Sequence, residues 1–389
     1  MIFHFFNPES DLALSQGEKN YNPPKNILRF SEDLSLLPLW YAGSSDCVLT
    51  RTSVPENWME EEREKLSVGA SWLSWNDYKK QSATSDILSP WGWNYSIYNR
   101  WKKESASQQI VDYAKLRELS SRAITREVLS LPYIKENLLP PSFVAPVILT
   151  SWEQLISFVH SHHRVVCKAP WSSSGKGLYW VENELPSGMK RWFENLVEKQ
   201  GFVMGEKVYD KVMDFAMEFR SENGQVSFQG YSFFQTDNGK YKGNLLTSDE
   251  WMETQLAQYV ECSVIKRLIE TLCVYFTNRV APYYTGYFGV DMMVIEDGGM
   301  RFIHPCVEVN LRMNMGVVSH ILNERYVNPN HQGRFFVSSF PTHEALLSFH
   351  VSMQEKFPLT IEKGRVIRGY LPLTYLSDEA LSLAALQVD

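Results

Sequence analysis

The feature that most constrains this fold is a glycine–lysine step that lies between two strand-like segments. Residues 165–180 read VVCKAPWSSSGKGLYW, with Lys176 between two glycines. A Walker A phosphate loop needs G-x-x-x-x-G-K-[ST] between a strand and a helix, but Pro170 stands five residues before Gly175 and Gly177 follows the lysine. The flanking segments RVVCKA and GLYWVEN are rich in residues typical of strands. We therefore predict two strands joined by a Ser/Gly turn, and not a P-loop.

Composition and charge exclude several classes of protein. The 389 residues carry a net charge of -7 and no basic block, which argues against binding along a nucleic-acid backbone. Five scattered cysteines without C-x-x-C spacing favour reduced thiols over a disulfide framework or a zinc site. Residues 1–11 lack a signal-peptide pattern, and no apolar run reaches the ~20 residues of a membrane span. We expect a cytoplasmic protein with no nucleic-acid or membrane partner, and homo-oligomerisation stays open.

The order of apolar runs and turn signals predicts an α/β chain. In residues 1–90, short apolar runs alternate with helical segments, which is typical of a small unit with a parallel sheet. Two Asn-Gly steps, at residues 223–224 and 238–239, predict the turns of an antiparallel meander. A thirty-residue helical pattern and a further hairpin follow, so strands and helices continue to alternate along the chain.

That further hairpin, GVDMMVIEDGGMRFIHPCVEVNLR, places polar side chains on one face. Side chains two residues apart on a strand share a face, so Glu308 and Asn310 point the same way, and Arg312 joins them if the strand continues. Together with Asp291 of the other strand, they offer two carboxylates and an amide, which suit Mg²⁺ held jointly with nucleotide phosphates. The alternative is a solvated strand face with ordinary surface polar residues.

The position of the turn decides which residue lies opposite Asp291. A two-residue turn at residues 298–299 places Asp291 opposite Cys306, with Glu308 as a diagonal neighbour at ~7–8 Å. A turn one residue earlier places it opposite His304. Both registers keep Asp291 on the face of the other polar residues. The proline of the second strand lacks an N–H, so it breaks the ladder and can introduce a bulge.

Four segments occur in a fixed order across roughly residues 115–318. They are a lysine strand with a small-residue loop (VVCKAPWSSSGKGL), a strand that enters a hinge (FVMGEKVYD), a strand with an acidic residue (GYFGVDMMV) and an E-x-N-x-R ending (VEVNLR). In this order they resemble the ATP-grasp superfamily of ATP-dependent carboxylate ligases. The lysine that the family usually carries before the lysine strand is replaced by Arg122, which keeps the charge and changes its geometry.

The resemblance implies roles for the matching positions. Lys168 and Arg122 would contact the phosphates of ATP, and Arg312 would stabilise the transferring phosphoryl group. The lid loop over the β- and γ-phosphates would comprise Ser172, Ser173, Ser174, Gly175 and Gly177. The adenosine contacts would be Glu206, Lys207 and Val208 at adenine and Asp214 at the ribose. Two Mg²⁺ ions, with Mn²⁺ as a substitute, would be held by Asp291, Glu308 and Asn310.

The resemblance also implies a fold and an activity. The fold class is α/β (α+β): two α+β subdomains grip ATP, and a small Rossmann-like α/β domain precedes them. The expected units are 1–114 (N-terminal domain), 115–200 (small or lid subdomain), 201–335 (large subdomain with the metal site) and 336–389 (C-terminal extension). The implied enzyme activates a carboxylate as an acyl phosphate and joins it to an amine, releasing ADP and phosphate. Its substrate would be a small molecule, an amino acid or a peptide; the alternatives are a small-molecule kinase and a nucleotide-binding regulatory protein without turnover.

Two N-terminal segments offer candidates for the acceptor side. The loop after a first parallel strand is where α/β units bind ligands, and here it carries Glu9 and Asp11. The segment SPWGWNYSIYNRW adds Trp91 and Trp93 in a loop. The alternatives are a capped strand-to-helix connection and a packing plug between domains.

Overall fold

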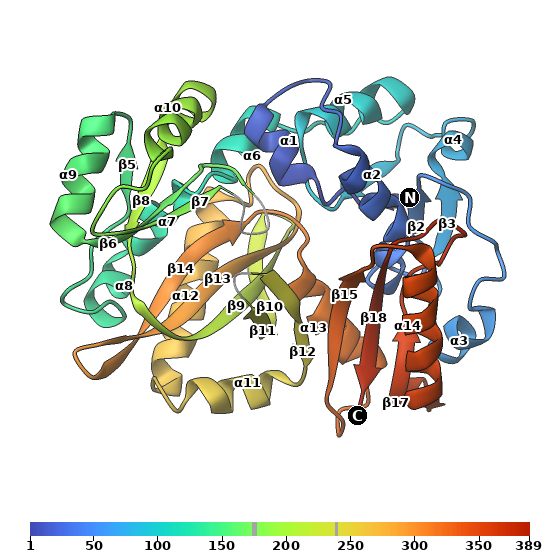
Figure 1. Cartoon of the computed structure of the whole chain (residues 1–389). Coiled ribbons are helices and arrows are strands. Elements are labelled where there is room, and N and C mark those ends of the chain that lie inside the picture. Colours follow the sequence, from blue (N-terminus) through green and yellow to red (C-terminus); the bar gives the residue numbers. More distant parts are fainter. Residues whose placement is uncertain (173–176, 238–239) are drawn as a thin grey trace.

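The computed structural model describes residues 1–172, 177–237 and 240–389. The strands of these residues form four sheets. Figure 1 shows the first and last parts of the chain on one side of the molecule and residues 147–207, with the helices α9 (Trp152–His162) and α10 (Met189–Gln200), on the other. The predicted turn at 238–239 and the loop residues Ser173, Ser174 and Gly175 lie outside the described residues.

The N-terminal unit is a small parallel sheet, as the alternation of strands and helices predicts. Its strand order is β3-β2-β1-β4, and all three pairings are parallel. Aromatic side chains fill its core, where Tyr78 stacks on Trp101. The strands are β1 (Ile2–Phe5), β2 (Cys47–Thr50), β3 (Ser71–Ser74) and β4 (Ile87–Pro90). The helices are α1 (Ser10–Gln16), α2 (Lys25–Asp33), the 3-10 helix η1 (Leu37–Trp40), α3 (Glu60–Lys65), α4 (Trp75–Tyr78) and α5 (Tyr95–Glu104).

Three short helices connect this unit to the second sheet: α6 (Tyr113–Leu119), α7 (Ile124–Leu129) and α8 (Pro132–Asn137). Pro132 begins α8 because proline is tolerated at the first helical position, where its missing N–H costs no helical bond.

The second sheet contains the hairpin that the sequence predicts, in place of a P-loop, for residues 165–180. Its order is β5-β8-β6-β7, and β6 and β7 are antiparallel with Lys168 opposite Leu178. The two predicted strands and their pairing as a hairpin are therefore confirmed. The strands are β5 (Val147–Leu149), β6 (Arg164–Lys168), β7 (Leu178–Glu182) and β8 (Val203–Lys207), and the helices are α9 (Trp152–His162) and α10 (Met189–Gln200). Ser151 and Gln154 form a capping box at the start of α9.

The third sheet has the order β10-β9-β13-β14 and is antiparallel. Phe219 and Phe288 on one face pack against Phe276 of α12, so the opposite face carries the polar side chains. The predicted turn at 223–224 joins β9 and β10, with positive φ at both residues. The elements are β9 (Asp210–Glu222), β10 (Gln225–Ser232), β13 (Gly286–Asp297), β14 (Met300–Asn310), α11 (Asp249–Leu256) and α12 (Cys262–Arg279).

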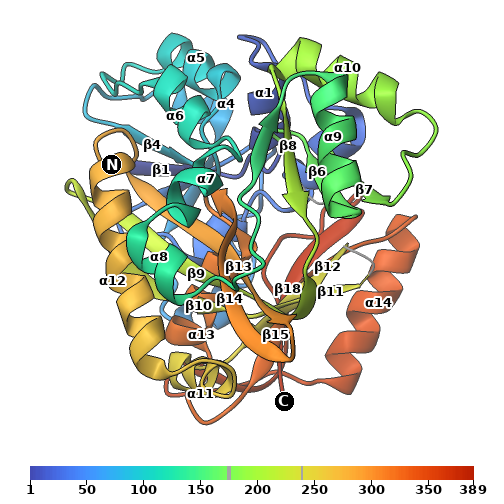
Figure 2. The same ribbon diagram turned by 90° about the vertical axis from the view of Figure 1, so that its left-hand side faces the viewer.

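The fourth sheet combines the middle of the chain with its C-terminal segment. Its order is β11-β12-β15-β18-β17-β16, and β15 spans the expected boundary between residues 335 and 336. All seven residues of β18 are buried. The elements are β11 (Phe234–Asp237), β12 (Lys240–Leu246), β15 (Gly333–Ser339), β16 (Thr360–Glu362), β17 (Arg365–Pro372), β18 (Ser382–Val388), α13 (Met315–Tyr326) and α14 (His343–Lys356). Figure 2 shows α14 beside this sheet, on the side away from α12.

All five cysteines are free thiols. Across the described ranges, no helix combines the length and apolar character needed to cross a lipid bilayer.

Candidate active site

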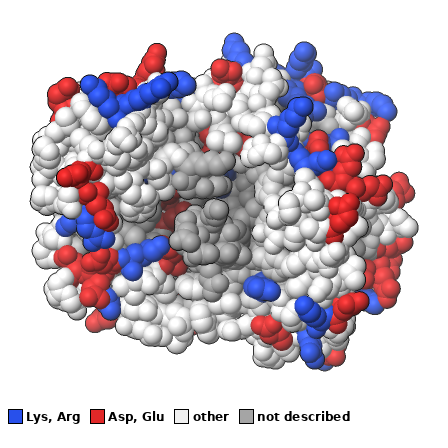
Figure 3. All heavy atoms as spheres, in the orientation of Figure 1, with Lys and Arg blue, Asp and Glu red and all other residues white. Residues whose placement is uncertain are grey.

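A cavity of about 580 Å³ is lined by residues from all four sheets or the loops that follow their strands. The N-terminal unit contributes Asp11 and Trp91, the second sheet contributes Lys168, and the fourth contributes Val337. Figure 3 shows this face of the molecule hollowed at its centre, with many of the charged side chains around the periphery. The polar floor of the cavity comes from the third sheet.

Two cross-strand rows of the third sheet form this floor. Each row runs from β9 through β13 to β14, and pairing places their members side by side: Ala216–Asp291–Glu308 and Glu218–Gly289–Asn310. Every one of these residues except Gly289 lines the cavity. The predicted polar face therefore exists, and the small residues Ala216 and Gly289 leave room above it.

The register of the hairpin differs from the prediction at one point. The turn is Gly298-Gly299, because Asp297 pairs with Met300. Asp291, however, lies opposite Glu308 and not opposite Cys306, since the ladder shifts between Asp291 and Met293. The shift adds two residues to β14 around its proline, which cannot donate to the ladder. Two extra residues preserve the face on which a side chain points, so the predicted face is right and the predicted partner is wrong.

Arg312 links this floor to the N-terminal unit. Its Nε donates to Asp11 Oδ2 at 2.8 Å, its Nη2 lies 2.8 Å from the same oxygen, and Nη2 also donates to Asn310 Oδ1 at 3.0 Å. Burial lowers the pKa of Arg312, but the ion pair with Asp11 outweighs burial, and the net shift is upward. The guanidinium therefore stays charged over the floor of the cavity.

Asp291 and Glu308 are neighbouring carboxylates. Burial and the repulsion from Glu308 both favour the protonated form of Asp291. Burial raises the pKa of Asp291 to about 7, and the negative charge of Glu308 adds to this shift. Asn310 Nδ2 donates to Asp291 Oδ2 at 3.0 Å and opposes it. A divalent cation between the two carboxylates would remove this repulsion, and their oxygen donors suit Mg²⁺.

The donor set is nevertheless small. Among residues 1–172, 177–237 and 240–389, no group of three or more His, Cys, Asp or Glu side chains could hold a metal ion. Two carboxylates and one amide fit Mg²⁺ only when water or phosphate oxygens complete its coordination, which is the usual arrangement for Mg²⁺ at nucleotides. The residues thus fit a shared Mg²⁺ site, and the assignment of Asp291, Glu308 and Asn310 stays a prediction.

Arg122 lies between the end of β6 and the floor of the cavity. Its Nη1 donates to Ala169 O at 2.6 Å and to Ser172 Oγ at 2.7 Å, and its Nη2 donates to Glu308 Oε1 at 2.7 Å. Its buried Nε has no hydrogen-bond partner among the described residues. The planar guanidinium therefore holds the start of the loop next to Glu308, and one N–H remains unused.

Lys168 lies at the end of β6 and lines the cavity. Its Nζ is 2.6 Å from Glu206 Oε2, and both side chains are almost fully buried. Lys207 and Val208 follow Glu206 outside the cavity lining: Lys207 Nζ donates to Ser142 O at 3.2 Å, and the Val208 N–H donates to Arg164 O at 2.9 Å. That N–H cannot donate to adenine at the same time.

The remaining predicted residues lie at the margin. Asp214 is on β9, two residues before Ala216 and on the same face, and its Oδ2 is 2.5 Å from Lys211 Nζ. Gly177 has φ +78°, which favours glycine, and its carbonyl accepts from the Ala169 N–H at 2.8 Å. Asp214 and Gly177 do not line the cavity, whereas Ser172 does.

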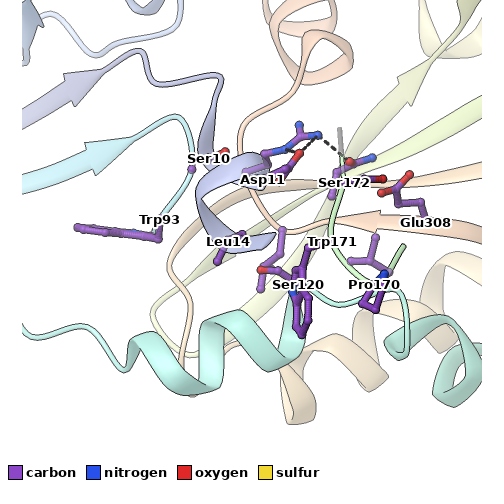
Figure 4. A pocket seen from close by; sticks show the side chains of 14 residues that line it. Ser10, Asp11, Leu14, Trp93, Ser120, Pro170, Trp171, Ser172 and Glu308 are labelled. Atoms are coloured by element: carbon purple, nitrogen blue, oxygen red, sulfur yellow. Dashed lines mark hydrogen bonds and ion pairs between the residues drawn. The ribbon is translucent and has the colours of Figure 1, made fainter. Parts of the chain in front are cut away.

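Figure 4 shows a smaller pocket beside the cavity, where Asp11 of α1, Ser172 and Glu308 lie around one space. Trp93 also lines it, and Trp91 lines the main cavity. The N-terminal candidates Asp11, Trp91 and Trp93 are thus brought to the site. Glu9 is not: it pairs with Arg51 at 3.0 Å within the N-terminal unit.

Sequence reasoning missed Glu218 and Asn314. Asn314 is the N-cap of α13, where its Oδ1 accepts from the Val317 N–H at 2.9 Å, and its Nδ2 donates to Glu218 Oε2 at 2.9 Å. Burial raises the pKa of Glu218 to about 8, the hydrogen bond from Asn314 opposes this shift, and Asp291 adds to it. The signal was available: in DFAMEF, polar or small residues alternate with Phe, Met and Phe, so Glu218 shares a face with Ala216.

Comparison with known proteins identifies similar folds but no protein that is similar in sequence. No protein-family model and no curated protein matches the sequence. Solved structures match over the whole chain. N5-carboxyaminoimidazole synthetase of Staphylococcus aureus is 10% identical, with a TM-score of 0.51 over 100% of this chain and 93% of that chain. Biotin carboxylase of Campylobacter jejuni is also 10% identical, with a TM-score of 0.51 over 100% of this chain and 87% of that chain.

The likeness extends over the whole of this chain and most of each of the two enzymes. The chain has the ATP-grasp fold. Both the second and the third sheet of this fold contribute residues to the cavity: Lys168 comes from the second sheet and the polar rows come from the third. The predicted fold class is confirmed, and at this level of identity the likeness speaks for the fold alone.

Proposed function

We propose that this chain is an ATP- and Mg²⁺-dependent ligase that joins a carboxylic acid to an amine. One observation carries the proposal: three cationic side chains face two carboxylates and an amide around a single cavity. These residues are Arg122, Lys168, Arg312, Asp291, Glu308 and Asn310. Phosphoryl transfer needs positioning and charge neutralisation more than covalent chemistry from the protein, and this set of side chains is suited to both.

The reaction would proceed in two steps. A carboxylate oxygen attacks the γ-phosphorus of ATP, the bond to the β-phosphate oxygen breaks, and ADP leaves. The amine nitrogen then attacks the acyl carbon, the bond to the phosphate oxygen breaks, phosphate leaves, and the nitrogen gives a proton to a base or to water. Lys168 and Arg122 would hold the phosphates, and Arg312 would stabilise the charge on the transferring phosphoryl group.

Asp291, Glu308 and Asn310 would hold Mg²⁺ against the phosphates. The bound cations would supply charge neutralisation at the phosphate oxygens. The chain's own contribution is to orient these ligands: Asn310 bonds both Asp291 and Arg312, and Arg122 fixes Glu308. The solved structure of the Campylobacter enzyme is an ATP complex, which supports a nucleotide at the corresponding place here.

The test is turnover with an identified product. The full chain would be incubated with ATP, Mg²⁺ and a panel of carboxylic acids and amines, while ADP, phosphate and new masses are followed. We expect ADP, phosphate and a joined product, and a loss of about 100-fold or more in Glu308→Gln, because one ligand of the charge-neutralising group is removed. Glu296→Gln, an exposed change on the same hairpin, is the matched control and should stay near the wild-type rate.

Other outcomes identify the alternatives. ADP with a phosphorylated compound and no joined product would identify a small-molecule kinase. Failure of the chain to bind ATP in calorimetry would exclude both enzymes.

A further inference from the structure

One carboxyl group of the cavity has no cationic partner among the described residues. Each cationic side chain of the lining already has an acidic partner: Arg122 pairs with Glu308, Lys168 with Glu206, and Arg312 with Asp11. Asp291 belongs to the proposed Mg²⁺ site. Glu218 is then the remaining carboxylate, and in the described part of the chain it makes no ion pair.

Glu218 is held in a shaped pocket, and its carboxyl group is buried. A Cβ at Gly289 would lie 2.5 Å from Glu218 Oε2, and a Cβ at Gly316 would lie 2.1 Å from Oε1. The two glycines therefore form a cradle that no larger residue could share. Asn314 donates the hydrogen bond that orients the carboxyl group. A buried carboxylate without a counter-ion is costly, so the pocket is suited to a cationic ligand.

We propose that the acceptor substrate carries a primary amino group that binds as an ammonium ion against Glu218. This inference rests on the proposed ligase function and names the class of its nucleophile. The ammonium ion gives one proton to the Glu218 carboxylate, and the free amine nitrogen then attacks the acyl carbon. Glu218 and Asn310 lie in the same cross-strand row, two strands apart, which corresponds to about 10 Å. An amine beside Glu218 therefore lies in the same cavity as Arg312, which donates a hydrogen bond to Asn310.

The surroundings favour an organic ammonium ion over a metal ion. Among the described lining residues, the Glu218 neighbours Ser232 and Asn314 are uncharged, and the nearby Asp291 belongs to the proposed Mg²⁺ site. Mg²⁺ and Ca²⁺ require more oxygen ligands than Glu218 offers here. Met315 and Val337 also line the cavity and offer an apolar surface to a carbon chain. A hydroxyl compound of the same size would leave the carboxylate without a counter-charge.

The test is a binding comparison between matched amines and alcohols. The full chain, with Mg²⁺ and a non-hydrolysable ATP analogue, would be titrated calorimetrically with small primary amines and their hydroxyl analogues, such as glycinamide with glycolamide and alaninamide with lactamide. We expect at least one amine to bind about tenfold or more tightly than its hydroxyl analogue, because only the ammonium compensates Glu218. Glu218→Gln should abolish this preference, and Glu222→Gln, an exposed change on the same strand, should retain it.

The outcomes separate this inference from the proposed function. Equal binding of amines and alcohols by the wild-type chain would overturn the inference, and this comparison needs no variant to fold. A wild-type chain that binds the ATP analogue and none of the amines would also overturn it while leaving the nucleotide assignment intact. An amine preference in a chain that does not bind the analogue would support the pocket and count against the ligase.

Discussion

Single residues of the cavity differ in the charge that they can carry. Arg312 is buried but held cationic by Asp11, whereas burial raises the pKa of Asp291 to about 7 and that of Glu218 to about 8. The apo protein therefore keeps protons on acidic groups that would be ionised in an unfolded chain. Stability and ligand binding are linked through these protons.

Glu218 predicts a pH dependence of folding. Its pKa rises from an ordinary value of 4.5 to about 8 on folding, so the folded chain retains a proton that the unfolded chain loses. Stability is fully present below pH 4.5 and is lost as pH rises through 8. Glu218→Gln removes this loss. We expect the free energy of unfolding of the variant to match that of the wild type near pH 5 and to exceed it above pH 8 by a few kcal/mol. Calorimetric Tm values of the nucleotide-free protein between pH 5 and 9 provide the measurement.

The control for this prediction is Glu222→Gln, which is exposed on the same strand and should follow the wild-type curve. The titration of Asp291 and Asp11 also contributes to the wild-type curve, because burial raises their pKa values. Only the difference in Tm between the wild type and Glu218→Gln therefore reports the titration of Glu218. Parallel curves for the wild type and Glu218→Gln would contradict the prediction.

At the scale of elements, the polar floor depends on how closely β13 and α13 approach β9. Gly289 on β13 and Gly316 in the first turn of α13 both face the Glu218 carboxyl group. Glycine is required at Gly316 because of this close approach and not because of its φ angle, which is not positive.

Gly316→Ala should therefore destabilise the protein by about 1–3 kcal/mol, the usual cost of overpacking, and should disturb Asn314. In a double-mutant cycle with Glu218→Ala, the cost of Gly316→Ala should fall, because the added methyl group no longer meets Oε1. Part of the cost should persist, since Ser232 Oγ lies 2.6 Å from the same methyl position. Denaturant unfolding of the four proteins measures the coupling, and strictly additive costs would argue against the contact.

The elements also show what the sequence can and cannot predict. Side chains alternate between the two faces along each strand of the hairpin, and this alternation predicts that Asp291, Glu308 and Asn310 share a face. The prediction succeeds because side-chain direction is a local property of a strand. The pairing of Asp291 with Glu308 is not local: it depends on two extra residues near Pro305, whose number no periodicity reveals. Glu218 was missed because its role depends on Gly289 and α13, which approach it only in the folded chain.

At the scale of the whole molecule, the C-terminal segment is tied to the N-terminal unit. Asp33 Oδ2, at the end of α2, accepts hydrogen bonds from the N–H groups of Leu381 and Ser382, each at 2.9 Å. Residues 320–389 show no motif in the sequence. Their place in the fourth sheet follows from the pairing of β15 with β12 and of β18 with β15, which joins strands that are far apart in the chain.

Asp33→Ala should lower the stability of the whole protein by about 1–3 kcal/mol, because two backbone N–H groups lose their acceptor in a region with little access to water. Asp33→Asn retains a side-chain carbonyl and should cost less. Glu32→Ala, a neighbouring change on the same helix that removes neither bond, is the control. Calorimetric unfolding compares the four proteins, and an Asp33→Ala variant as stable as Glu32→Ala would show that this contact does not hold the two ends of the chain together.

The place of β18 has a consequence for how the protein is made. β18 is the last strand of the sequence, and it lies in the interior of the fourth sheet, between β15 and β17. β15 and β17 cannot join into one sheet until β18 has been synthesised and has inserted between them. Until then the edges of β15 and β17 that β18 covers stay unpaired. Deletion of residues 382–388 should thus open the fourth sheet in its middle and leave both edges free to associate with other chains.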